Sequence, residues 1–150
     1  MSRHAVRVEW RSDGGFRENR YSRAHLWRFD GGAEVRASSS PAVVPEPMSD
    51  AAGVDPEEAL VASVSSCHLL WFLHVARDAG FDVASYEDDA EGALGRDERG
   101  RMAVTRIVLR PRIGFAGAVP DAATLKRLHD EAHERCFIAN SLRSEVVVEA

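Results

Sequence analysis

The sequence predicts an α+β protein in which strands gather around one long apolar helix instead of alternating with helices in βαβ units. Residues 59–79 are helix-compatible throughout and apolar on most of their circumference. Short strand-like segments with glycine-rich turns precede this helix, and further strands, one amphipathic helix and a last strand follow it. No repeat or linker divides the 150 residues, so we expect a single domain over residues 1–150.

Composition and charge narrow the class of protein. Hydrophobic residues make up 45% of the chain and charged residues 29%, as in an ordinary soluble globular protein. The net charge is −5 and no basic tract is present, which argues against a nucleic-acid partner. Nothing approaches the ~20 apolar residues of a membrane span, and the first residues lack the apolar stretch of a signal peptide. We therefore expect a cytoplasmic protein with no membrane partner.

The first third of the chain reads as three strands and a loop. Residues 5–10 alternate apolar and polar side chains, and residues 16–26 allow a second, weaker strand. Residues 29–37 read as a turn at Asp30-Gly31-Gly32 that leads into a third strand. Residues 38–54 hold three of the six prolines and form a long loop, which in a small domain is often functional.

The strongest helix signal follows this loop. Asp55 is a good N-cap, Pro56 suits the first helical position, and Gly80 is a natural C-cap after Ala79. Because the helix is apolar almost all round, we expect it to be buried on most sides.

The rest of the chain reads as two long strands, a helix and a final strand. Residues 81–94 and 101–115 are the strands, and imperfect alternation in the second suggests a bulge. The acidic run 87–89 is most simply solvated. An amphipathic helix begins at Pro120-Asp121, and the chain ends in a short strand within 144–150.

Two cysteines are the first candidates for chemistry. Cys67 lies within the apolar helix and Cys136 follows the amphipathic one. Free cysteine is often a small buried filler, and that interpretation remains open for both. Two thiols on two helices also permit a redox pair, although the C-x-x-C spacing of thioredoxin-like proteins is absent.

Histidines offer a second candidate. His129 and His133 stand four residues apart, with Cys136 three residues further, a spacing that permits a zinc site. The alternative, which we favour, is two exposed histidines on the polar face of the helix. His68 and His74 have no partner at ligand spacing, and we expect them to be core or boundary residues.

Two longer segments resemble the OsmC/Ohr family, the osmotically induced and organic-hydroperoxide-resistance proteins. Residues 54–81 resemble the central helix of that family, with a Pro-Glu pair at its start, a small-residue run and Ser-x-Cys. Pro56 and Cys67 have the family's spacing of eleven positions. Residues 133–150, which begin HERCFIANSL, resemble its C-terminal helix, second cysteine and final strand.

This resemblance implies a fold and an activity. The fold is OsmC-like, with two antiparallel sheets packed around a long buried central helix in an intertwined homodimer. The activity is that of a thiol peroxidase that reduces organic hydroperoxides with neither cofactor nor metal. By carry-over, Cys67 is the peroxidatic cysteine and Cys136 the resolving one. Their disulfide needs an external dithiol reductant, for which a lipoyl-type dithiol is one candidate.

The resemblance also implies an Arg–Glu pair beside the peroxidatic thiolate. Glu57 occupies the Glu of the family's Pro-Glu pair. Counting back from Ser39 without a gap places Arg23 where the Ohr-like branch keeps its Arg, with Arg20 and Arg36 as fallbacks. A guanidinium there stabilises the thiolate and the departing oxygen, and Glu57 orients the Arg.

Helix geometry adds an expectation about assembly. Glu57 and Cys67 are ten residues apart, which is about 15 Å along one straight helix with side chains roughly 80° apart. No proline or glycine lies between Pro56 and Gly80 to break the helix. We therefore expect Glu57 to serve the Cys67 of a second subunit.

Two other functions remain open. An OsmC-like protein that binds a small molecule or lipid, with weak or no peroxidase activity, is the main alternative. Metal binding through His129, His133 and Cys136 is the third.

Overall fold

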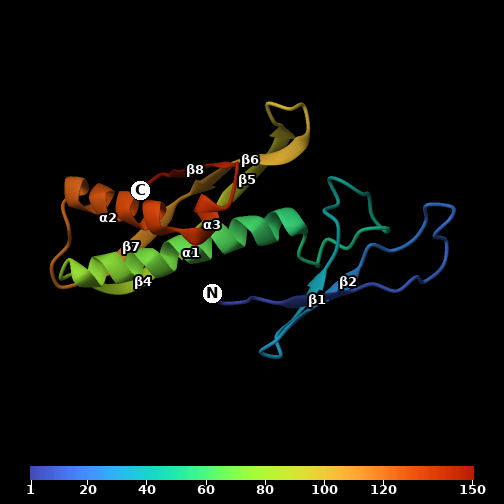
Figure 1. Cartoon of the computed structure of the whole chain (residues 1–150), viewed down its shortest axis with the longest axis horizontal. Helices are drawn as coiled ribbons and strands as arrows, with labels where there is room; N and C mark the ends of the chain where they lie inside the picture. Colours follow the sequence, from blue (N-terminus) through green and yellow to red (C-terminus); the bar gives the residue numbers. More distant parts are fainter. The chain divides into compact units, whose positions relative to one another are not determined.

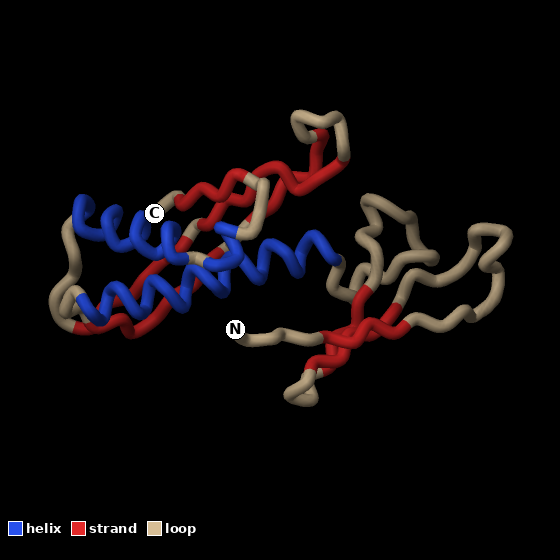
Figure 2. Tube along the Cα trace, viewed as in Figure 1, coloured by secondary structure: helices blue, strands red, loops and turns tan.

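The computed structural model describes all 150 residues and has the predicted α+β class (Figures 1 and 2). The chain forms two compact units, Met1–Ala59 and Leu60–Ala150. That they make up one domain stays a prediction.

The first unit contains a three-stranded antiparallel sheet. Its strands are β1 (Val6–Glu9), β2 (His25–Phe29) and β3 (Glu34–Ala37), in the order β1-β2-β3. The first and third agree with the sequence analysis, and Gly32 takes a φ of 94° in the turn before β3. The second strand was misplaced, because it begins only at His25 and not at residue 16.

An aromatic cluster explains why residues 16–24 are not a strand. The chain leaves β1, turns back through Asn19, whose φ is 58°, and returns as β2. Within this excursion Trp10, Phe16 and Tyr21 pack against one another, with ring centroids 4.9 to 5.9 Å apart. Packing among these three rings replaces the pairing that a longer strand would provide.

The long helix α1 runs from Pro56 to Asp78 and begins as its sequence predicts. The Glu58 amide donates to the Asp55 carboxylate at 2.8 Å, and the Asp55 amide donates to the Glu58 carboxylate at 3.2 Å. This reciprocal capping box satisfies two amides that the helix itself leaves free. The helix ends before Gly80, whose φ is 89°.

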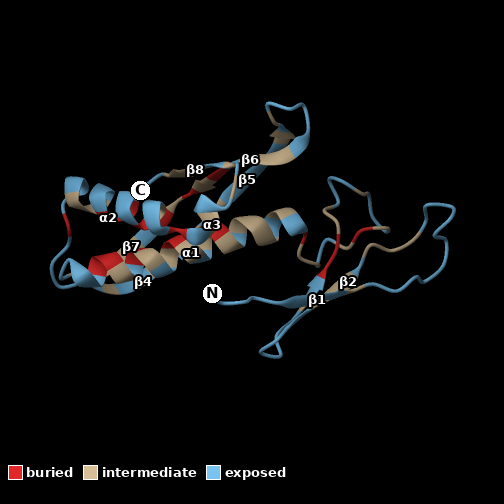
Figure 3. Cartoon of the chain, in the orientation of Figure 1, coloured by how far each residue is buried: buried red, intermediate tan, exposed pale blue.

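The burial of α1 differs from the prediction. Only one stripe of the helix is buried, made up of Val64, His68, Phe72, Val75 and Ala76 (Figure 3). On other faces, large apolar side chains reach solvent in the single chain: Leu70 is 63% exposed and Leu73 37%. The expectation that α1 is covered on most sides is therefore wrong for one chain alone.

The hydropathy of α1 also corrects the sequence analysis. By length and composition alone this 23-residue helix meets the criterion for a membrane span, with a mean hydropathy of 1.6 in its most apolar window. A core helix of an α+β protein meets the same criterion. The packing of its buried stripe against strands and a second helix is that of a core helix.

Five strands of the second unit form two sheets. β4 (Asp82–Asp88) pairs antiparallel with β7 (Pro111–Ala116). The other sheet has the order β5-β6-β8, with β5 (Glu91–Arg96) antiparallel and β8 (Glu145–Val148) parallel to β6 (Met102–Leu109). Each long strand of the sequence analysis is thus two strands that belong to different sheets.

Asp88 marks the point where the chain changes sheet. Its carboxylate accepts hydrogen bonds from the backbone amide of Arg110, at 2.6 Å, and from the hydroxyl of Ser65. Arg110 separates β6 from β7, which belong to different sheets. The Asp88 carboxylate therefore links the change of sheet after β4 to the change of sheet after β6. Asp88 is half-buried, which corrects the view that the whole acidic run is solvated. The predicted bulge is present, because the β5–β6 register shifts between Ala93 and Leu94.

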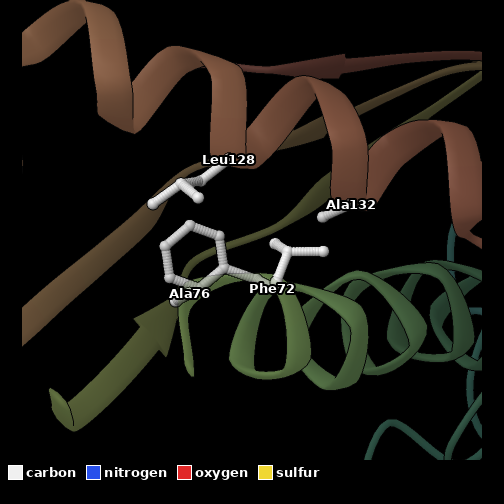
Figure 4. Close-up of a cluster of buried hydrophobic side chains, with 5 residues drawn as sticks. Phe72, Ala76, Leu128 and Ala132 are labelled. Carbon is white, nitrogen blue, oxygen red and sulfur yellow. The ribbon is translucent and has the colours of Figure 1, made fainter. Parts of the chain in front are cut away.

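Helix α2 (Ala122–Arg135) packs on α1 in the second unit. Asp121 caps it as predicted, accepting a hydrogen bond from the Thr124 amide at 2.7 Å. Phe72 and Ala76 of α1 meet Leu128 and Ala132 of α2 in a buried hydrophobic cluster (Figure 4). A four-residue helix, α3 (Phe137–Asn140), follows Cys136 and was not predicted.

Candidate functional site

The four predicted site residues divide between the two units. Arg23 and Glu57 belong to the first, and Cys67 and Cys136 belong to the second. Glu57 and Cys67 nevertheless lie on the same helix, because α1 begins in the first unit and continues through the second.

A pocket of about 480 Å³ in the first unit holds both members of the predicted Arg–Glu pair. Arg23 and Glu57 supply its charged groups. Apolar side chains from β1, the aromatic cluster and the loop after β3 surround them, among them Trp10, Phe16 and Val43. The pocket therefore combines an apolar wall with one cation and one carboxylate.

Arg23 and Glu57 line one pocket without forming an ion pair. The Arg23 guanidinium donates to the Tyr21 carbonyl and to Oδ1 of Asn19, both at 2.7 Å, and stacks 3.6 Å from the centre of the Tyr21 ring. Oε2 of Glu57 is buried and has no hydrogen-bond partner. A buried acceptor without a donor costs free energy, so the Glu57 carboxylate can accept a hydrogen bond from a cationic side chain.

The two fallback arginines lie elsewhere. Arg36 donates to the Asp50 carboxylate at 2.6 Å, and neither Arg36 nor Arg20 lines the pocket. Of the three arginines that the sequence allowed, Arg23 is the one that shares a pocket with Glu57.

The two thiols of the second unit are neighbours. Cys136 is buried and Cys67 is half-buried, and neither forms a disulfide. Burial, together with the adjacent Cys67 sulfur, raises the pKa of the Cys136 thiol to about 11. The Ala139 amide, which donates to the Cys136 sulfur at 3.4 Å, opposes this shift.

This arrangement gives the two sulfurs different chemistry. A partly exposed thiol can meet a substrate, whereas a buried thiol with a raised pKa reacts only with a group brought to it. The arrangement would allow Cys67 to react with a substrate first and Cys136 to react afterwards with the modified Cys67.

The structure corrects the interpretation of His129. It is 2% exposed instead of lying on a polar face, and it stacks on Phe72 with ring centroids 4.4 Å apart. Nε2 of His68, itself 1% exposed, is 3.0 Å from Nδ1 of His129 in a hydrogen bond between α1 and α2. The amphipathic pattern could not reveal this, because it counts histidine as polar. His74 binds Asp78 at the surface, 3.2 Å away.

The zinc hypothesis is not supported by the geometry. No group of three or more His, Cys, Asp or Glu side chains is arranged to hold a metal ion. His129 instead uses one ring nitrogen to bind His68, so His129, His133 and Cys136 do not form a ligand set.

Both buried imidazoles are neutral, which makes stability depend on pH. Burial lowers the pKa of His129 from 6.5 to about 4, and burial together with the facing imidazoles lowers the pKa of His68 from 6.5 to about 4. Their contribution to stability is present above pH 6.5 and is lost as the pH falls toward 4, because the unfolded chain binds protons first. Chemical denaturation across this range measures the effect.

The matched variant for this prediction is the double substitution His68→Leu with His129→Leu. Near pH 5 we expect unfolding of the wild type to take up about two more protons than unfolding of this variant. If the free energy of unfolding changes with pH in the same way for the wild type and the double variant, the two imidazoles are not held neutral by burial.

Comparison with known proteins places this arrangement in a family. Residues 49–150 match the family described as OsmC-like protein. An OsmC-like protein of unknown function from Vibrio cholerae has a solved structure that is 50% identical, with a TM-score of 0.97 over 99% of each chain. The chain therefore belongs to the OsmC family, and the predicted resemblance and OsmC-like fold are confirmed.

More distant relatives carry functional names. Peroxiredoxin OsmC of Escherichia coli is 26% identical over 97 residues, which are 65% of this chain and 66%, just under two thirds, of the relative. An organic hydroperoxide resistance protein from Elizabethkingia anophelis is 18% identical, with a TM-score of 0.68 over 98% of this chain and 94% of its own, and shares the fold.

Proposed function

We propose that the protein is a cysteine-based peroxidase that reduces organic hydroperoxides through Cys67 and Cys136. The observation that carries this proposal is the contact between a half-buried thiol on α1 and a buried thiol after α2, on the scaffold of the OsmC family.

The reaction has three balanced steps. The Cys67 thiolate attacks the outer oxygen of the hydroperoxide, so an S–O bond forms, the O–O bond breaks, and the alkoxide leaves and takes up a proton. Cys136 then attacks the Cys67 sulfenic acid, so an S–S bond forms and its thiol proton leaves with the hydroxyl as water. An external dithiol reduces the disulfide and is itself oxidised, which suits a reducing compartment such as the cytoplasm.

Arg23 and Glu57 complete the site in this proposal. A guanidinium beside Cys67 favours the thiolate and can donate to the departing oxygen. Its present partners, Asn19 and the Tyr21 carbonyl, would exchange for the unpaired carboxylate of Glu57 in the same pocket. A bidentate pair with Glu57 would fix the orientation of the guanidinium.

The proposal includes a homodimer with two composite sites. α1 is unbroken from Pro56 to Asp78, so Glu57 and Cys67 of one chain are separated by about 15 Å along its axis. The Glu57 of each subunit would therefore serve the Cys67 of the other. Exposed apolar side chains on and beside α1, such as Leu70 and Phe137 at 63% and 67%, suit coverage by a second subunit.

The pocket favours an organic substrate. Its apolar wall lies beside Arg23, the group proposed to bind the peroxide oxygens, and can receive an alkyl or aryl substituent. Hydrogen peroxide has no such substituent and gains nothing from the wall.

The same pocket allows the alternative of a small-molecule or lipid-binding protein with little peroxidase activity. Consumption of an alkyl hydroperoxide in the presence of dithiothreitol separates the two functions. Multiple turnovers by the wild type support the peroxidase. Binding of the corresponding alcohol or of a fatty acid, without turnover, supports the alternative.

Arg23→Ala should slow the reaction of Cys67 with tert-butyl hydroperoxide by on the order of 10²-fold. Stopped-flow kinetics measure this effect. Arg20→Ala and Arg36→Ala are the matched controls and should stay close to the wild type. A larger defect in either control would mean that Arg23 is the wrong arginine.

A further inference from the structure

The hydrogen bond between His68 and His129 joins α1 to α2. The two rings are stacked, with centroids 5.3 Å apart and planes 8° apart, and the bonded nitrogens are 3.0 Å apart. Phe72 lies against the ring of His129. The bond is therefore shielded from water, where a single hydrogen bond has its largest effect on position.

Each histidine of this pair lies on the same helical segment that carries or precedes a cysteine of the proposed reaction. His68 follows Cys67 directly on α1. His129 lies on α2, and Cys136 follows the last residue of that helix as its C-cap. A bond between the imidazoles therefore fixes how far α1 can slide along α2, and with it the distance between the two sulfurs.

The surroundings of the pair allow it to be sensitive to acid. Four other titratable groups lie near the pair. His133 and Asp130 are on α2, and Asp88 and Tyr86 are on β4. None of them forms a hydrogen bond with either imidazole, and the free ring nitrogens His68 Nδ1 and His129 Nε2 are buried without partners. The charges of Asp130 and Asp88 favour an imidazolium at His129, but burial outweighs them and keeps its pKa low.

The protonation state decides whether the bond can exist. A neutral imidazole has one donor and one acceptor nitrogen, so two neutral rings can share one N–H···N bond. Two imidazolium rings have only donors and repel each other. Burial keeps the pKa of both rings at about 4, so the bond persists at neutral pH and is lost in acid.

We propose that His68 and His129 are positioning residues whose hydrogen bond holds Cys67 and Cys136 together for disulfide formation and releases them in acid. This inference rests on the proposed function, in which that disulfide forms from the Cys67 sulfenic acid and the Cys136 thiol with loss of water. The imidazoles exchange no atoms with the sulfurs, and they act through the relative placement of the two helices.

The effective concentration of the two thiols tests the proposal. It is obtained by equilibrating the full chain with reduced and oxidised glutathione and counting the Cys67–Cys136 disulfide by intact mass. His129→Leu, which removes the bond, should lower this concentration about tenfold, the equivalent of one buried hydrogen bond. His129→Asn, whose amide takes the place of Nδ1, should restore it.

The pH dependence separates positioning from general stabilisation. A double variant with His68→Gln and His129→Asn keeps an amide–amide bond but cannot titrate. Relative to this variant, the wild-type effective concentration should fall about fourfold between pH 6 and pH 3, because about four fifths of the pairs then carry two imidazolium rings and have lost the bond. Selenocystamine catalyses the exchange at acid pH.

Two outcomes would overturn the inference: an unchanged effective concentration in His129→Leu, or superimposable pH curves for the wild type and the double amide variant. If His129→Leu does not fold, the pH comparison decides alone. Because glutathione disulfide replaces hydroperoxide here, a protein that forms the disulfide yet consumes no hydroperoxide would contradict the proposed function and leave this inference standing.

Discussion

Cys67→Ser will leave the protein unable to consume alkyl hydroperoxide in the presence of dithiothreitol, a loss on the order of 10³-fold or more. The thiolate is the nucleophile that attacks the O–O bond, and a serine hydroxyl stays protonated and does not replace it. Intact mass after one equivalent of hydroperoxide should show no added oxygen. If this variant keeps most of the wild-type activity, the assignment of the attacking sulfur is wrong.

Cys136→Ser is the matched variant, because it leaves the attacking sulfur and removes the second one. It should react once with hydroperoxide and stop at the sulfenic acid of Cys67, which further peroxide converts to sulfinic acid. The wild type should instead lose both free thiols to an internal disulfide and gain no oxygen. Thiol titration and intact mass distinguish these products. Sustained turnover by Cys136→Ser would remove Cys136 from the cycle.

The raised pKa of Cys136 fits this order of events. At neutral pH the buried thiol is almost entirely protonated, so it does not compete with Cys67 for the hydroperoxide. It reacts only after Cys67 carries a leaving group beside it. The different burial of two adjacent sulfurs thus gives the sequence of steps a physical basis.

Much of the fold could be predicted from local signals. The Asp55 cap, the proline after it and Gly80 bound α1 correctly, because each satisfies a backbone requirement that the sequence displays directly. The changes of sheet at Asp88 and Arg110 could not be predicted in this way. They depend on a hydrogen bond between residues 22 positions apart, which no local pattern records.

The candidate site shows the same division. Cys67 and Cys136 were found because their sequence contexts resemble a family, and the structure brings the two thiols into contact. The burial of His129 was missed, because its partner His68 lies 61 positions earlier and both count as polar in an amphipathic pattern. The pairing of Arg23 with Glu57 stays a prediction, since the two share a pocket but are not bonded.

Subunit mixing measures whether Glu57 of one subunit serves the Cys67 of the other. Glu57→Ala and Cys67→Ser homodimers should each be nearly inactive. After full subunit exchange, half of the dimers are mixed, and each mixed dimer has one site with both native residues. We therefore expect recovery of about one quarter of the wild-type activity per subunit, measured as hydroperoxide consumption under dithiothreitol.

A second mixture is the control. The double variant with both Glu57→Ala and Cys67→Ser, mixed equally with wild type, gives mixed dimers in which each site lacks one native residue. If the sites are composite, exchange should lower the activity per wild-type subunit by about half, since only wild-type homodimers stay active. If each chain builds its own site, the first mixture stays inactive and the second loses nothing. That pair of results, or a fully active monomer in solution, would contradict the composite site.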